Sequence, residues 1–140
     1  MREVLFRGKR IDNDEWIKGS FWNEIPGELG GIATYGSCVF RHVHLTTVGQ
    51  FTGLTDKNGE KIFEGDIVKS VFNKESYVVL CGEYVYETDY TGEMHGFYLE
   101  NIRKKYDVSP FGCSYNWAVI IGNIHDNPEL ITGGECDAVD

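Results

Sequence analysis

The chain has 140 residues, the size of one domain, and its 41% hydrophobic and 14% aromatic residues supply enough apolar surface for a packed core. Its 22 acidic and 13 basic residues give a formal charge of −9, which opposes binding to phosphate backbones and to anionic lipid. No apolar run approaches the roughly 20 residues of a membrane-spanning helix, and the first residues lack a signal-peptide pattern. We therefore expect a folded cytoplasmic protein that binds neither membrane nor nucleic acid.

The N-terminal segment predicts a β-hairpin made of Leu5–Lys9 and Glu15–Trp22, with the polar turn Ile11–Asp14 between them. This hairpin carries three large aromatic side chains, Trp16, Phe21 and Trp22. A side chain of this size buries roughly 150–250 Å², so we expect the rings to pack in the core or at a subunit contact. A ligand-binding surface is the alternative, and Trp22 is a candidate for it.

A loop is expected over Glu24–Gly31, and a strand from Ile32 to about His44. His42 and His44 are two residues apart and would share one face of an extended strand. That spacing holds a metal ion if a third ligand arrives from elsewhere. The favoured interpretation is that both histidines lie on the solvent face of an edge strand.

The central stretch Thr52–Val68 predicts two tight reversals of β-chain. Asn58-Gly59 is a strong hairpin signal, because a type I′ turn needs a positive φ at both central residues. Gly65 marks the second reversal, where Asp66 can accept hydrogen bonds from nearby backbone amides. We assign these four residues a structural role in turns.

Six segments of the chain carry a recognisable signature: Phe6–Lys9, Trp16–Gly19, Val48–Leu54, Asp56–Gly59, Ile62–Val68 and Ile121–Leu130. Together they resemble the YopX family of phage and prophage proteins over nearly the whole chain. The resemblance implies a mainly β fold, with an SH3-like barrel (β-roll) core and an N-terminal β-hairpin extension. It implies one YopX-like domain over residues 1–131 and a phage or prophage origin, but no particular activity.

After the central stretch, strands Asp66–Asn73 and Tyr77–Cys81 are expected around the polar loop Lys74–Ser76. In the next segment a period of two places three tyrosines on one face, namely Tyr84, Tyr86 and Tyr90. A tyrosine row can form a peptide-binding groove or a base-stacking platform, although the acidic residues around it disfavour nucleic acid. Core or oligomer packing is the favoured interpretation of this row.

The C-terminal third contains one ambiguous segment and one clear strand. Gly96–Lys105 fits either a helix or a strand, whereas the unbroken apolar run Trp117–Ile121 predicts a strand buried on both faces. Pro128 suits the first position of a short C-terminal helix, which Asn127 can cap. Residues 132–140 form an acidic tail without the apolar content to pack, and we expect it to be disordered.

The chain has four widely spaced cysteines, Cys38, Cys81, Cys113 and Cys136. They form no Cys-x-x-Cys pair, so we interpret them as free thiols and expect neither a metal nor another cofactor. Motifs of nucleotide-binding, hydrolase and metalloprotease sites are missing from the sequence, which argues against an enzyme. The carboxylates Asp56, Glu64 and Asp66 cluster beside turn glycines and are interpreted as turn residues instead of catalytic ones.

These observations lead to a non-catalytic protein-binding module as the first functional hypothesis. Its surface would be formed by Trp22, Tyr84, Tyr86 and Tyr90, and its partner would be a host or phage protein. The alternative is a self-assembling structural or accessory protein, a homo-oligomer that buries the same aromatic surface between copies. A third hypothesis, an acidic mimic of nucleic acid, rests on the net charge alone.

Overall fold

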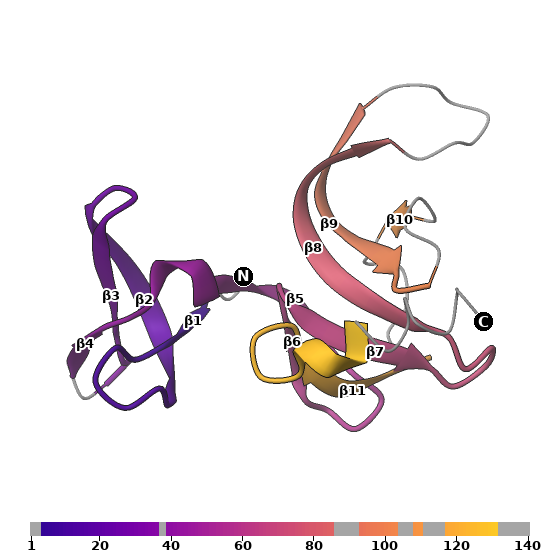
Figure 1. The fold of residues 1–140 in the computed structure, drawn as a ribbon, viewed down its shortest axis with the longest axis horizontal. Helices are drawn as coiled ribbons and strands as arrows, with labels where there is room; N and C mark the ends of the chain where they lie inside the picture. Colours follow the sequence, from indigo (N-terminus) through magenta and orange to yellow (C-terminus); the bar gives the residue numbers. More distant parts are fainter. Residues whose placement is uncertain (1–3, 37–38, 86–92, 104–107, 111–116, 132–140) are drawn as a thin grey trace. The chain divides into compact units, whose positions relative to one another are not determined.

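The computed structural model describes residues 4–36, 39–85, 93–103, 108–110 and 117–131. The structure is mainly β, as predicted, and its strands form two antiparallel sheets, each with an open strand order instead of a closed barrel (Figure 1). The chain divides into two compact units, Met1–Gly53 and Leu54–Asp140. The expected disordered tail lies outside the described residues, and the single domain over residues 1–131 stays a prediction.

The first unit contains β1 (Phe6–Lys9), β2 (Trp16–Ile25), β3 (Leu29–Ala33), β4 (Phe40–His42), the 3-10 turn η1 (Leu45–Thr47) and the start of β5 (Gly49–Thr55). Its strands lie side by side in the order β4-β3-β2-β1-β5. The predicted N-terminal hairpin is confirmed, since β1 pairs with β2 from Phe6 opposite Gly19 to Lys9 opposite Trp16. Alternation along β2 sends Ile17 into a core with Ile32 and Val43.

The second unit contains the end of β5 together with β6 (Lys61–Phe63), β7 (Asp66–Ser70), β8 (Ser76–Val85), β9 (Glu93–Asn101), β10 (Val108–Pro110) and β11 (Ala118–Asn123). Five strands form an antiparallel sheet in the order β10-β9-β8-β7-β11, in which β8 and β9 are a long curved pair (Figure 1). The segment Gly96–Lys105, left open by the sequence, is therefore strand up to Asn101. The core of this unit is built from Ile62, Val68, Val79, Leu99 and Ala118.

The prediction that Trp117–Ile121 is buried on both faces is wrong. Ala118 is fully buried, but Ile121 is 40% exposed. The reason is topological: β11 is an edge strand of the five-stranded sheet, and its pairing with β7 shifts register between Ile120 and Gly122. A bulge of this kind turns a side chain away from the core.

The first reversal of the central stretch has a different geometry from the predicted type I′ turn. Gly59 has a φ of +86°, but Asn58 is not among the described non-glycine residues with positive φ, which are Asp14 and Lys74. Gly59 N–H donates to Asp56 C=O at 3.0 Å, and Asp56 N–H donates to Glu60 C=O at 2.8 Å. This is the longer hairpin loop in which a glycine in the left-handed region follows an ordinary turn.

The second reversal matches its prediction. Gly65 has a φ of +94°, and the Oδ2 atom of buried Asp66 accepts a hydrogen bond from Phe63 N–H at 2.7 Å. Both backbone groups of Gly65 are engaged, because its N–H donates to Val79 C=O and its C=O accepts from Ile124 N–H. The turn therefore connects β8 with the segment after β11.

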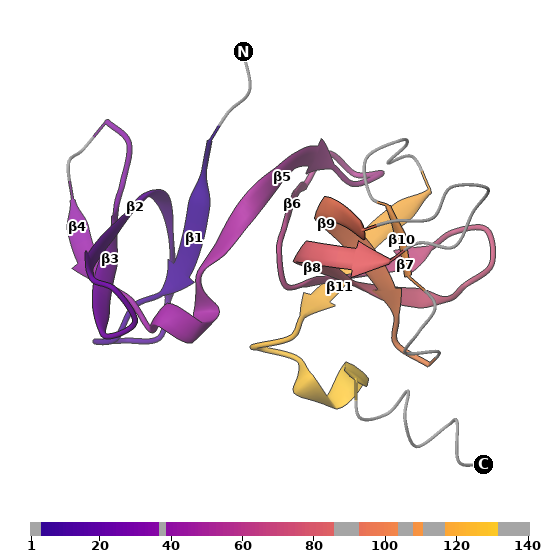
Figure 2. The ribbon, with the colours of Figure 1, turned by 90° about the horizontal axis from the view of Figure 1, so that it is seen from above.

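The chain continues from β11 into one helical turn over residues 128–131, which begins at Pro128 as predicted (Figure 2). The side chain of Asn127 accepts a hydrogen bond from Asn123 N–H at 3.2 Å, so it closes the preceding turn and does not cap a helical amide. A Cβ on Gly122 would lie 2.5 Å from Asn127 Oδ1, which explains the glycine at this position. None of the helices in the described ranges has the length and apolar character of a membrane span.

Candidate functional site

The predicted tyrosine row cannot be placed as a surface. Tyr86 and Tyr90 lie outside the described residues, and Tyr84 is placed by its backbone opposite Met94 in β9. Trp22 belongs to the first unit, whereas Tyr84 belongs to the second. A common surface of these four aromatic residues therefore stays a prediction.

Trp22 lies in an aromatic cluster on one face of the first unit. Its side chain is 50% exposed, and its ring packs edge-on against Phe40 with centroids 4.9 Å apart. Phe40 in turn packs against His42 at 5.1 Å. The ring of Phe40 covers Gly31 of the neighbouring strand, where a Cβ would lie 2.5 Å from Phe40 Cζ. Trp16, on β2 as well, is packed differently, because Arg7 Cζ lies 4.7 Å from the centre of its ring.

The two histidines that could have held a metal ion each face a different carboxylate. His42 Nε2 lies 3.4 Å from Glu24 Oε1, and His44 Nε2 lies 3.1 Å from Asp14 Oδ1. Within the described part of the chain, no group of three or more His, Cys, Asp or Glu side chains comes close enough to hold a metal ion.

The free edge of the first sheet is partly closed. Next to the edge strand β4 lies a shallow cavity of about 270 Å³, lined by Ile11, Asp12, Phe40, Arg41 and His42. The backbone oxygen of His42 accepts from Ile11 N–H at 3.1 Å, and that of Phe40 accepts from the Arg41 guanidinium at 2.8 Å. Occupied backbone groups of this kind protect an edge strand from pairing with another chain.

The turn carboxylate of Asp56 accepts hydrogen bonds from backbone amides. Asp56 is 3% exposed, and its Oδ1 accepts hydrogen bonds from Asn58 N–H at 2.8 Å and Glu60 N–H at 2.9 Å. Its Oδ2 accepts from Ile120 N–H at 3.0 Å, on the outer edge of β11. These contacts give Asp56 the structural role that the sequence predicted for it.

Two hairpin loops in the chain have the same length and the same backbone geometry. In residues 10–15, Arg10 N–H donates to Glu15 C=O, and the fourth loop residue, Asp14, has a φ of +60°. In residues 70–75, Ser70 N–H donates to Glu75 C=O, and Lys74 has a φ of +63°. The second loop runs from Val71 to Lys74, so the polar loop predicted at Lys74–Ser76 begins earlier than expected.

An asparagine holds each loop at the same place. Asn13 Oδ1 accepts from Glu15 N–H, and Asn73 Oδ1 accepts from Glu75 N–H, both at 2.9 Å. The loops differ in the residue before the asparagine, which is Asp12 in the first and Phe72 in the second. Phe72 is 80% exposed. At this exposure the ring buries little apolar surface within the fold, which makes Phe72 a candidate contact residue.

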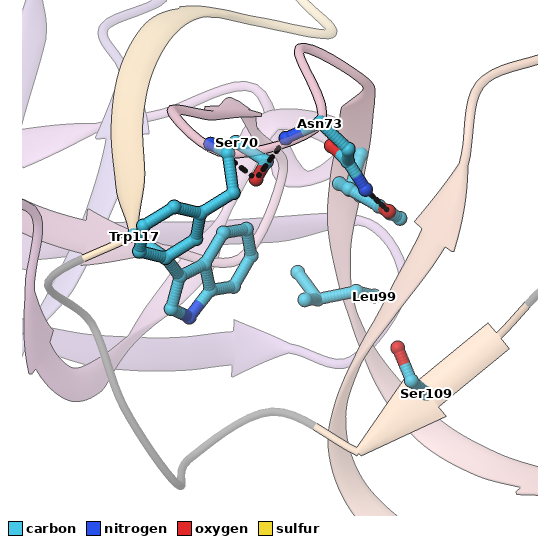
Figure 3. A pocket seen from close by; sticks show the side chains of 7 residues that line it. Ser70, Asn73, Leu99, Ser109 and Trp117 are labelled. Carbon is cyan, nitrogen blue, oxygen red and sulfur yellow. Dashed lines mark hydrogen bonds between the residues drawn. The ribbon is translucent and has the colours of Figure 1, made fainter.

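Behind Phe72 lies a cavity of about 470 Å³, lined by Ser70, Phe72, Asn73, Tyr77, Leu99, Ser109 and Trp117 (Figure 3). The rings of Tyr77 and Trp117 meet edge to face with centroids 6.0 Å apart, and buried Leu99 reaches the cavity from β9. The end of β7, β8, β9, β10 and the residue before β11 thus all contribute. Val71 N–H donates to Trp117 C=O at 2.7 Å, which fixes the loop against this wall.

Hydrogen bonds connect the residues at the rim of the cavity. Ser70 Oγ accepts from the backbone N–H of Phe72 at 3.2 Å and of Asn73 at 3.4 Å (Figure 3). Glu75 Oε2 accepts from Asn73 Nδ2 and from the Tyr77 hydroxyl, both at 3.3 Å. The cavity therefore combines apolar walls with a few ordered polar groups, the usual composition of a binding pocket.

The net charge is distributed unevenly between the two units. Residues 1–53 contain six basic and six acidic residues, whereas residues 54–140 contain seven basic and sixteen acidic residues. The whole formal charge of −9 therefore belongs to the unit that carries the cavity. Sequence reasoning missed this cavity, although the pattern Asn-x-Glu, shared by residues 13–15 and 73–75, could have placed Phe72 at a loop tip.

The profile of the YopX protein family matches residues 5–132. The chain belongs to the YopX family. A comparison with curated proteins found no match. Among solved structures, the YopX chain is similar to the crystal structure of protein EF1440 from Enterococcus faecalis, with 20% identity and a TM-score of 0.51. The similarity covers 94% of this chain and 99% of that chain, and at this identity it supports the fold alone.

Proposed function

We propose that this YopX protein is a non-catalytic protein-binding module whose binding site is the cavity lined by Tyr77, Leu99 and Trp117, with Phe72 at its rim. The observation that carries the proposal is the 80% exposure of Phe72 beside an apolar cavity. A small ligand confined to the cavity would contact only the part of this ring that lines it and would leave the rest in water. A protein partner can fill the cavity and cover the ring at the same time.

Covering the Phe72 ring would make a measurable contribution to the affinity for a partner. Burying a phenylalanine side chain contributes roughly 1.5–3 kcal/mol, which corresponds to about a tenfold to hundredfold change in Kd. The loop is already ordered by Ser70 and Asn73, so binding loses little conformational entropy there. Large aromatic side chains on a rigid support are typical of residues that dominate a protein interface.

The finer features of the hypothesis belong to the same proposal. They are an SH3-like core with an N-terminal β-hairpin extension, a phage or prophage origin, and action in the host cytoplasm on a host or phage protein. The second candidate is self-assembly, which the half-exposed cluster of Trp22 and Phe40 favours. Light scattering during size-exclusion chromatography distinguishes a monomer from a homo-oligomer.

Photo-crosslinking tests the site directly. Benzoylphenylalanine at position 72 is expected to form crosslinks to a discrete host or phage protein in cells. The same residue at position 12 is the matched control, because Asp12 occupies the equivalent position of the other hairpin loop. Equal crosslinking from both positions would contradict the proposal, and crosslinks from position 72 to the chain itself would support self-assembly.

A further inference from the structure

We infer that the cavity binds an apolar or aromatic side chain from a positively charged segment of the partner protein. This inference rests on the proposed function, because it specifies the partner of the same site. The apolar side chain follows from the walls, which are formed by Tyr77, Leu99 and Trp117. The positive charge follows from the electrostatics of the second unit.

The second unit carries the negative net charge of the chain. It contains sixteen acidic residues against seven basic ones. A surplus of one sign attracts segments of the opposite sign and repels segments of the same sign before any contact forms. The net charge of this unit therefore repels an acidic peptide or a nucleic acid, whereas it attracts a lysine-rich or arginine-rich segment.

Glu75 places one of these carboxylates beside the cavity. Its Oε2 accepts hydrogen bonds from the Asn73 amide and from the Tyr77 hydroxyl, both of which belong to lining residues. The carboxylate is thus held close to whichever side chain enters the cavity. Lys74, the exposed last residue of the loop Val71–Lys74, carries the opposite charge next to Glu75. The attraction for a cationic segment therefore comes from the net charge of the whole unit, and Glu75 places one carboxylate beside the cavity.

The exposed ring of Phe72 indicates a partner that extends beyond the cavity. Because it is 80% exposed at the loop tip, a ligand confined to the cavity leaves most of it uncovered. A chain segment with one side chain in the cavity continues over the rim and covers the ring. Neighbouring lysine or arginine residues of that segment would then lie near Glu75.

A library of random peptides displayed on phage tests this inference on the full-length protein. Peptides are selected on the parent chain and counter-selected on Phe72→Ser, and the enriched peptides are synthesised for titration. We expect each to combine a large apolar residue with net positive charge. Affinity should fall as salt increases, because the Debye length shrinks from about 10 Å at 0.1 M to about 3 Å at 1 M.

Two charge variants provide a matched comparison. Glu75→Gln removes the carboxylate at the cavity, keeps its shape and retains an oxygen that can accept hydrogen bonds. It should weaken binding of the selected peptides by roughly two- to fivefold, as for a solvent-exposed ion pair. Glu60→Gln removes one carboxylate from a different hairpin of the same unit and should leave the affinity almost unchanged. Phe72→Ser should weaken binding about tenfold or more. Equal thermal melts confirm that all three variants fold.

The outcomes separate the inference from the proposed function. Enrichment of neutral or acidic peptides that still require Phe72 would refute the inference that the partner segment is positively charged, and it would leave the proposed binding function intact. If no enriched peptide requires Phe72, the proposed site is wrong. A self-association equilibrium that is lost in Phe72→Ser, measured by sedimentation, would instead assign the cavity to a second copy of the chain.

Discussion

The substitution Asp56→Asn should destabilise the protein strongly, although it replaces a carboxylate by an amide of the same shape. The carboxylate accepts backbone hydrogen bonds from Asn58 and Glu60 through Oδ1 and from Ile120 through Oδ2. An asparagine has one oxygen, which can continue to accept from the two loop amides. Its nitrogen then faces Ile120 N–H, and two donors cannot bond to each other.

The magnitude follows from these contacts. A hydrogen bond to a charged acceptor contributes about 1.5–3 kcal/mol, and a buried donor without a partner costs about 1–3 kcal/mol. Since Asp56 is 3% exposed, water cannot easily replace the lost acceptor. We expect a loss of about 2–3 kcal/mol, a large share of the ~5–15 kcal/mol that stabilises a typical domain.

Urea unfolding at pH 7 measures this loss as a shift of the midpoint at constant slope. Asp12→Asn is the control, because Asp12 is exposed at a hairpin tip and pairs with Arg10 on the surface; its midpoint should stay close to that of the parent. Hydrogen exchange should also show faster exchange of the Ile120 amide in Asp56→Asn. A midpoint equal to that of Asp12→Asn would refute the argument that this carboxylate holds the turn to β11.

The other predictions concern the turn glycines, a thiol and two binding properties. Gly65→Ala and Gly59→Ala should each lower the free energy of unfolding by about 1–2 kcal/mol, because both positions have a positive φ. Gly59→Asn should recover part of this loss. Thermal melts in which the two alanine variants melt with the parent, or in which Gly59→Asn melts no higher than Gly59→Ala, would contradict this prediction. Burial, and secondarily the charge of Glu64, raises the pKa of the Cys81 thiol, so its alkylation by iodoacetamide at pH 8 should be slower than that of an unstructured peptide thiol. Glu64→Gln should speed it up, as mass spectrometry of the labelled peptide can verify. The purified protein should carry no stoichiometric metal, and one zinc ion per chain in elemental analysis would disprove this. A mobility-shift assay at physiological salt should show no binding to duplex DNA, given the charge of −9; salt-sensitive submicromolar binding would count against it.

The sequence by itself determined the features that depend on neighbouring residues. The positive φ of Gly65, the bonding of Asp66 to a nearby amide and the helical turn at Pro128 follow from residues a few positions apart. The mainly β class follows from alternation and turn spacing, which are also local. Membership of the YopX family could likewise be predicted from the sequence, and the family profile confirms it over residues 5–132.

Some local predictions were wrong because the sequence around a turn does not reveal the strands beside it. The Asn58-Gly59 pair was assigned a two-residue turn, but the carboxylate of Asp56 bonds to Asn58 and Glu60 and favours a longer loop. The run ending at Ile121 was assigned to the centre of a sheet, yet its strand lies at the edge. Apolar residues indicate burial, but strand order decides how many neighbours are available to provide it.

Only the tertiary structure decided where the candidate site lies. The contact of Asp56 with Ile120 joins residues 64 positions apart, and the cavity brings Ser70 and Tyr77 together with Trp117. No periodicity links these positions, because they meet through the pairing of β7 with β8 and β11. The sequence therefore determined the turns and the class of fold, whereas long-range strand pairing decided which aromatic rings form a cavity and which one remains exposed at its rim.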